Sequence, residues 1–71
     1  MRKNAKLPRV LGKKIQRLRK KASLTQEELA KKIRISTTYM GFIEQGRYSP
    51  SLKIIEKIAK ILRMRVGDLF P

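Results

Sequence analysis

The ionisable side chains of this 71-residue chain are nearly all cations: 19 Lys and Arg stand against 5 Asp and Glu, and His and Cys are absent. Histidine is the commonest general base and metal ligand, and cysteine supplies thiolate nucleophiles and zinc ligands. No two of the five carboxylates form an acid/base pair of the kind that hydrolysis needs. We therefore expect no catalysis, no metal and no cofactor. A net charge of +14 instead favours binding to a polyanion.

The positive charge is concentrated towards the two ends of the chain. Residues 1–21 contain ten bases and no acid, residues 47–71 contain six bases and two acids, and residues 22–46 are neutral overall. The nine residues Ile35–Ile43 form the longest charge-free run. A membrane span needs about 20 apolar residues, so we expect no membrane span and do not expect a membrane among the partners. The lack of cysteine and of an apolar leader favours the cytoplasm.

Helical periodicity runs through the sequence, and no segment alternates with period two. The first predicted helix has a stripe of apolar residues and ends at Ser23-Leu24. The second and third have shorter apolar faces, and the fourth has a longer one. In chain order these faces are Leu11, Ile15, Leu18 and Ala22; Leu29, Ala30 and Ile33; Tyr39, Met40 and Ile43; and Leu52, Ile55, Ile58, Ala59 and Leu62. Residues 67–70 predict a final turn that folds back on the core.

Capping signals mark where these helices begin and end. Thr25 and Glu28 have the spacing of a capping box at the start of the second helix. Ser36 can cap the third helix, which Gly46 ends as a C′ residue would. The segment 49–51 (SPS) opens the fourth helix, with its proline in the first turn. We expect four to five helices and no sheet.

Several short motifs follow one another in a fixed order: 24–30 (LTQEELA), 35–36 (IS), 39–40 (YM), 43–46 (IEQG), 50–52 (PSL) and 66–70 (VGDLF). In these motifs and their spacings, from Leu11 to Phe70, the chain resembles the lambda-repressor/Cro-like helix-turn-helix family, also called the XRE family. The resemblance implies an all-α fold, a compact bundle of five short helices whose third helix lies in the DNA major groove. It implies a DNA-binding domain over residues 7–71, preceded by a basic N-terminal arm over residues 1–6. Such an arm can reach DNA or simply be disordered.

The outer side of the predicted third helix carries no charge, because Met40 and Ile43 fix its inward side. By the resemblance, this outer side holds the base-reading residues Thr37, Thr38, Gly41 and Phe42. A hydroxyl can donate or accept, and a Thr methyl or a Phe ring can pack on a thymine methyl. The alternatives are ordinary first-turn threonines, a tolerated glycine, and a Phe that belongs to the core or to a dimer contact.

The resemblance also implies contacts to DNA phosphates. Gln26 begins the second helix, where backbone N–H groups favour an anion. A second set flanks the start of the fourth helix: Gln45, Arg47, Ser51 and Lys53. For Gln26 and for the uncharged members of this set, the alternative is a solvated surface position.

Two further positions have structural interpretations. Arg19 and Glu44 lie where the family has a buried ion pair that joins the first helix to the end of the third. The family usually has glycine in the turn before Ile35, where φ is often positive, and this chain has Arg34. Either a non-glycine residue there costs about 1–2 kcal/mol, or the turn differs slightly from that of the family.

We therefore expect a sequence-specific double-stranded DNA-binding protein, a small prokaryotic transcriptional regulator and a repressor rather than an activator. The resemblance implies a homodimer, formed in solution or only on DNA. An antitoxin- or coactivator-type interaction adaptor is the alternative, and Phe42 and Tyr48 would serve it. A membrane-active cationic bundle is a third reading, which the capped, closely spaced helices disfavour.

Overall fold

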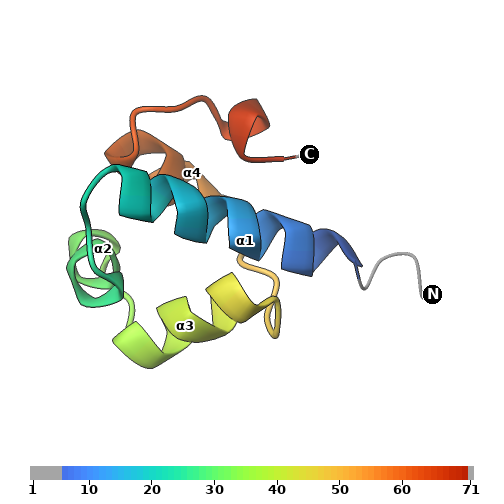
Figure 1. Cartoon of the computed structure of the whole chain (residues 1–71), viewed down its shortest axis with the longest axis horizontal. Helices are drawn as coiled ribbons and strands as arrows, with labels where there is room; N and C mark the ends of the chain where they lie inside the picture. Colours follow the sequence, from blue (N-terminus) through green and yellow to red (C-terminus); the bar gives the residue numbers. More distant parts are fainter. Residues whose placement is uncertain (1–5, 71) are drawn as a thin grey trace.

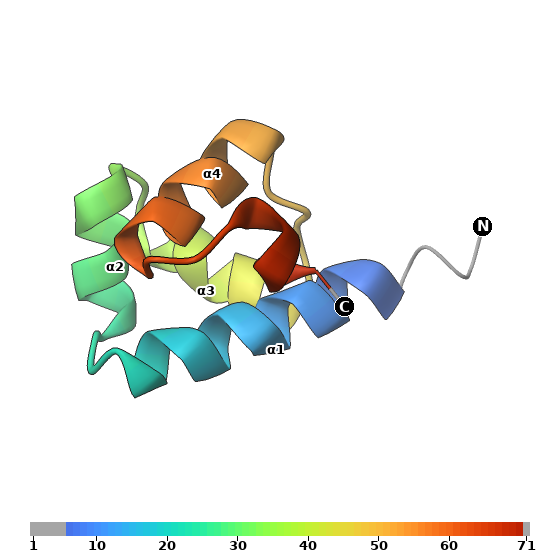
Figure 2. The ribbon, with the colours of Figure 1, turned by 90° about the horizontal axis from the view of Figure 1, so that it is seen from above.

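A computed structural model describes residues 6–70, and all regular secondary structure within that range is helical. The elements are α1 (Lys6–Lys21), α2 (Gln26–Ile33), α3 (Thr37–Gln45), α4 (Leu52–Ile61) and the 3₁₀-helix η2 (Val66–Leu69). Figure 1 shows α1 crossing the molecule, with α3 on one side of it and α4 on the other. Figure 2 shows α2 at the end of the molecule where α1 finishes. The predicted all-α class is confirmed, with four α-helices and one short 3₁₀-helix.

Helix α1 is longer at its start than its apolar stripe indicated. It begins at Lys6, and Pro8 is accommodated because the N–H groups of a first turn need no partner within the helix. The expected arm therefore has its last residue inside a helix, and residues 1–5 lie outside the described residues. None of the helices in residues 6–70 is both long and apolar enough to cross a membrane.

The end of α1 corrects one prediction about its buried stripe. Leu11 and Ile15 are buried as expected, but Ala22 is exposed. The helix ends at Lys21, and Ser23 adopts a left-handed conformation with φ of 61°. Ala22 thus lies in the turn that redirects the chain into α2, and its methyl group points away from the core.

The predicted start of α2 is confirmed. The Thr25 backbone N–H donates to Glu28 Oε1 at 2.8 Å, and the Glu28 N–H donates to Thr25 Oγ1 at 3.0 Å. The hydrogen bond from the Thr25 backbone N–H lowers the pKa of the exposed Glu28 carboxyl, and that with the Thr25 side chain adds to this effect. This capping box fixes where the short second helix begins.

The start of α4 differs from the prediction in two residues. Ser51 is the N-cap, and its hydroxyl accepts the Ile54 N–H at 3.2 Å, so Pro50 precedes the helix and is buried there. Leu52, predicted to be buried, is 62% exposed. Helix α4 packs against α2 and η2, but the Leu52 side chain at its start remains largely in solvent.

The core lies where α1, α2, α3, α4 and η2 meet. Each element contributes at least one side chain to it, and Leu69 of η2 is completely buried, which confirms that the C-terminal turn folds back. The buried apolar residues are Leu11, Ile15, Leu29, Ala30, Ile33, Met40, Ile43, Ile55, Ile58, Ala59 and Leu69.

Helices α1 and α3 approach so closely that their backbones touch at Gly12. A Cβ atom at this position would lie 2.3 Å from the carbonyl oxygen of Ile43 and 2.7 Å from that of Glu44. Both are backbone atoms, which cannot move aside as a flexible side chain would. Glycine at position 12 therefore sets the distance between α1 and α3.

Arg34 has the predicted positive φ. Its φ and ψ of 62° and 45° are left-handed, and its N–H donates to the carbonyl oxygens of Ala30 and Lys31 at the end of α2. Such caps favour glycine, since a Cβ crowds the backbone there. Ser23 and Arg63 adopt the same conformation, with φ of 61° and 58°. These two strained positions were not predicted.

Replacing Arg34 with glycine removes the Cβ strain but adds freedom to the unfolded chain. Because the strain relieved is about 1–2 kcal/mol and the entropic loss about 0.5–1 kcal/mol, we expect Arg34→Gly to raise the free energy of unfolding by up to about 1.5 kcal/mol. Urea denaturation measures it. Arg34→Ala is the matched control and should show no such gain, since alanine keeps the Cβ. A lower stability for Arg34→Gly would contradict the strained geometry.

Candidate nucleic-acid interface

A buried ion pair joins α1 to the end of α3. Arg19 Nε donates to Glu44 Oε2 at 2.6 Å and Arg19 Nη2 donates to Glu44 Oε1 at 3.0 Å. Their side chains are 7% and 1% exposed. Arg19 Nη1 also donates to the carbonyl oxygen of Leu24 at 2.7 Å, which ties in the turn between α1 and α2. Two parallel bonds of this kind fix both orientation and distance.

Gln26 extends this network to the first turn of α2. Its Nε2 donates to Glu44 Oε1 at 2.9 Å, so one carboxylate holds side chains from α1 and α2. The second amide hydrogen of Gln26 and its Oε1 stay available for another partner. Gln26 is therefore neither buried nor a free surface side chain, but a polar group held in a defined position beside α3.

The outer side of α3 begins with two exposed threonines. Thr37 and Thr38 follow the N-cap Ser36, whose hydroxyl accepts the Tyr39 N–H at 3.0 Å. Met40 and Ile43 are completely buried on the inner side, as predicted. The first turn of α3 therefore presents two hydroxyls and two methyl groups to solvent, with the backbone behind them fixed by the core.

The expected exposure of the middle of α3 is wrong in part. Gly41 is buried, because side-chain atoms of Gln26 and Gln45 lie over it. A Cβ at position 41 would meet Gln26 Oε1 at 3.7 Å and Gln45 Nε2 at 4.0 Å. Gly41 thus sits beneath two polar side chains, on the side of α3 that carries the threonines.

Phe42 is half-buried rather than freely exposed. Its ring meets the Tyr48 ring edge-on at a centroid distance of 5.3 Å, and Arg47 Cζ lies 4.5 Å from the ring centroid. The ring centroid of Tyr39 lies 6.0 Å from that of Tyr48. The loop after α3 therefore folds back over Phe42, and the stacked guanidinium of Arg47 is held beside the outer face of α3.

The remaining predicted phosphate contacts lie on the surface around the loop between α3 and α4. Gln45, Arg47, Ser51 and Lys53 are all exposed. The Ser51 oxygen caps α4, and its hydroxyl hydrogen stays available to donate.

Sequence reasoning missed Arg9, which packs against the end of α3. A Cβ at Gly46 would lie 2.4 Å from Arg9 Cγ and 2.7 Å from Arg9 Cα. Figure 2 likewise shows the first turns of α1 beside the loop that joins α3 to α4. The two residues are 37 positions apart in the sequence, so no local pattern could have indicated the contact.

Three of the five carboxylates are engaged within the fold. Glu28 caps α2, Glu44 pairs with Arg19, and Asp68 accepts from the backbone N–H and Nε of Arg65. These contacts with Arg65 lower the pKa of Asp68, the side-chain hydrogen bond most of all. Residues 6–70 contain no cluster of three carboxylates suited to a metal ion.

Two short helices joined by the three residues 34–36, with the second helix exposed along one side, define a helix-turn-helix protein. The family comparison agrees. The helix-turn-helix family pattern matches residues 15–69, and the chain belongs to this XRE-type helix-turn-helix family.

Named relatives share most of the domain. An uncharacterized HTH-type transcriptional regulator of Archaeoglobus fulgidus is 44% identical over 57 residues, which are 80% of this chain and 81% of that protein. The immunity repressor protein of Bacillus phage phi105 is 41% identical over 59 residues, or 83% of this chain and 41% of that protein. The crystal structure of SinR, the master regulator for biofilm formation, in complex with DNA superposes with a TM-score of 0.78 at 30% identity, covering 83% of this chain and 95% of that one.

Removing one partner of a buried ion pair leaves the other charge uncompensated, at a cost of about 3–5 kcal/mol. We therefore expect Arg19→Ala to lower the Tm sharply in a thermal melt followed by circular dichroism. Arg17→Ala is the control, because Arg17 is an exposed cation on the same helix. It should melt like the unmodified protein. An unchanged Tm for Arg19→Ala would show that the network does not hold the helices.

Proposed function

We propose that this protein is a sequence-specific double-stranded DNA-binding transcriptional regulator that places α3 in the major groove. The observation that carries the proposal is the first turn of α3, where Thr37 and Thr38 are exposed and uncharged while the helix behind them is fixed by the core. An α-helix fits the major groove, where every base pair presents a distinct pattern of donors, acceptors and methyl groups. Threonine can match a donor, an acceptor or a thymine methyl.

The side chains around α3 fit contacts to the DNA backbone. Gln26, held by Glu44, can donate its second amide hydrogen to a phosphate at the start of α2, where the N–H groups of the first turn also point outward. Arg47, held over Phe42, and Lys53 can serve a second phosphate beyond the end of α3. Gly41 and Phe42 then contribute through the shape of the surface, and Phe42 acts chiefly by supporting Arg47.

The proposal extends to assembly and regulation. Helix-turn-helix proteins that bind as dimers read two half-sites about one helical turn apart, so a homodimer on an inverted repeat is expected. Similarity to a phage immunity repressor supports repression rather than activation. The engaged carboxylates give no support to a catalytic role. A small prokaryotic regulator of this kind would act in the cytoplasm.

Selection from random genomic fragments tests this function. The protein is mixed with the fragments at several salt concentrations, and the bound pool is sequenced. A regulator enriches a palindromic motif, and its affinity falls with salt by about 0.9 in logarithmic slope for each phosphate neutralised. Salt-sensitive binding without any motif would contradict the proposal and favour an interaction adaptor.

The roles of two sets of side chains can be separated with variants on the selected site. Thr37→Ala with Thr38→Ala should relax sequence preference, with each lost base contact worth about 1–3 kcal/mol, and leave the salt slope unchanged. Lys53→Ala is the comparison variant and should weaken binding to all sequences while reducing the slope by about 1. Fluorescence anisotropy on matched and mismatched duplexes, repeated at several salt concentrations, measures the sequence preference and the salt slope of each variant. A uniform loss for the threonine variant would assign these residues to phosphate contact instead.

A further inference from the structure

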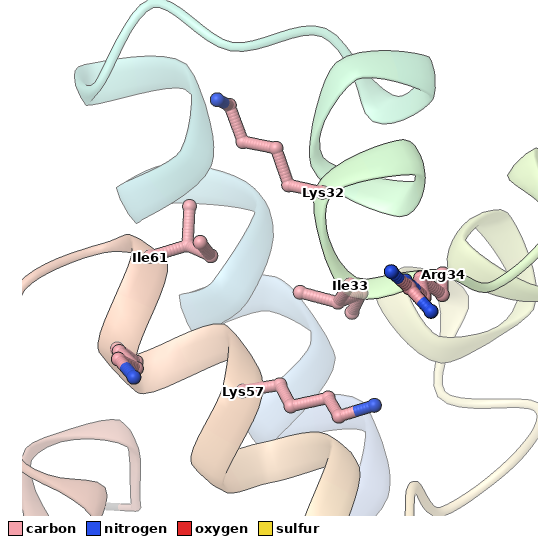
Figure 3. Close-up of a pocket in the computed structure, with 6 residues that line it drawn as sticks. Lys32, Ile33, Arg34, Lys57 and Ile61 are labelled. Carbon is pink, nitrogen blue, oxygen red and sulfur yellow. The ribbon is translucent and has the colours of Figure 1, made fainter.

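A groove separates the end of α2 from α4. It has a volume of about 280 Å³ and is lined by Lys32, Ile33, Arg34, Lys57, Lys60 and Ile61. Figure 3 shows Ile33 and Ile61 facing each other across the groove, with Lys32 above them, Lys57 below them and Arg34 beyond Ile33. The groove therefore has an apolar floor between cationic rims.

The groove continues along the second half of α4. A further hollow of about 540 Å³ shares Lys32, Lys60 and Ile61 with it and reaches Leu24, Leu62 and Arg63 near the end of α1. No acidic side chain of the described residues lines either part. One elongated surface, here called the α2–α4 groove, thus combines aliphatic side chains with five cations.

Two of these cations stand at strained backbone positions. Arg34 and Arg63, towards the two ends of the groove, have φ of 62° and 58°. Glycine would relieve both positions, yet each carries a guanidinium that lines the groove. Strain that persists beside a binding surface is often part of its function.

From this surface we infer that the α2–α4 groove binds an acidic amphipathic segment of a partner protein. Leucine-like side chains of the segment would cover Ile33 and Ile61, and its Asp and Glu side chains would meet the cationic rims. This site lies beyond the proposed DNA contact. None of the residues that line the groove is among those proposed to contact DNA, so the two sites use separate side chains.

Other occupants match the surface less well. A phosphate backbone would pair with the cations but would leave the isoleucine floor without a partner. A second copy of this chain carries the same net charge of +14, which opposes association through a cationic groove. An acidic amphipathic segment matches both the charge and the apolar floor.

The probe is a fluorescein-labelled, helix-forming peptide of glutamates with leucine at every third or fourth position. Its partner probe has serine in place of leucine and the same charge. The groove variant is Lys57→Glu with Lys60→Glu, and the matched control is Lys13→Glu with Lys20→Glu, two exposed cations of α1 that do not line the groove. Anisotropy titrations give the affinities, and thermal melts confirm that each variant folds.

We expect the unmodified protein to bind the leucine peptide more tightly than the serine peptide, by roughly tenfold or more. The groove variant should lose most of that preference, while the control keeps it, and Ile61→Ala should weaken only the leucine peptide. If the groove variant melts at a lower temperature than the control, the milder variant Lys57→Gln with Lys60→Gln replaces it. That variant must also lose preference for the leucine peptide, though to a smaller degree.

Three results would overturn the inference. Equal binding of the two peptides would mean that only charge acts. Equal losses for the groove and control variants would mean that the groove has no special role. A greater loss of affinity for a random-sequence DNA duplex in the groove variant than in the control would assign the groove to nucleic acid.

Discussion

The arrangement of the domain depends on one buried carboxylate, that of Glu44. It accepts two hydrogen bonds from the Arg19 guanidinium and a further one from Gln26, so α1, the first turn of α2 and the end of α3 share one anchor. A buried charge must keep its partners, and none of these helices can shift without breaking a bond to it. Gly12 lets the backbones of α1 and α3 come close enough for the anchor to form. A helix of only nine residues thereby keeps a fixed orientation although one side has no protein support.

In the proposed function, general attraction to DNA and the choice of base sequence fall to different parts of this chain. Cations dominate α1 and the C-terminal third, whereas the charged side chain of α3, Glu44, is buried and paired with Arg19. Long-range attraction to DNA needs charge but carries no sequence information, and base edges are read at short range by polar and methyl groups. In the DNA complex proposed above, the uncharged outer side of α3 would limit how far attraction to phosphates competes with base contacts.

The parts of the structure predicted correctly from the sequence are those set by neighbours along the chain or by the family motif. Thr25 and Ser36 cap their helices through bonds to residues three positions away, so local pattern sufficed. The Arg19–Glu44 pair and the positive φ of Arg34 followed from the resemblance. The predicted burial of Leu52 and the predicted exposure of Phe42 were wrong, because each depends on parts of the fold that are distant in the sequence. The Leu52 side chain is left uncovered, whereas the loop containing Tyr48 covers Phe42. The contact between Arg9 and Gly46 and the groove lined by Lys57 are likewise tertiary features without a local signal.

Adding a side chain at Gly41 would have a different effect from adding one at Gly12. A Cβ there would make only ordinary contacts of 3.7–4.0 Å with Gln26 and Gln45. Alanine at this mid-helix position would favour the helix by about 1 kcal/mol, so the fold does not require the glycine. A new methyl group would appear among the side chains that we place nearest the DNA. Position 41 is therefore where a single substitution can redirect target choice without weakening the scaffold, an open route by which this regulator could evolve new binding sites.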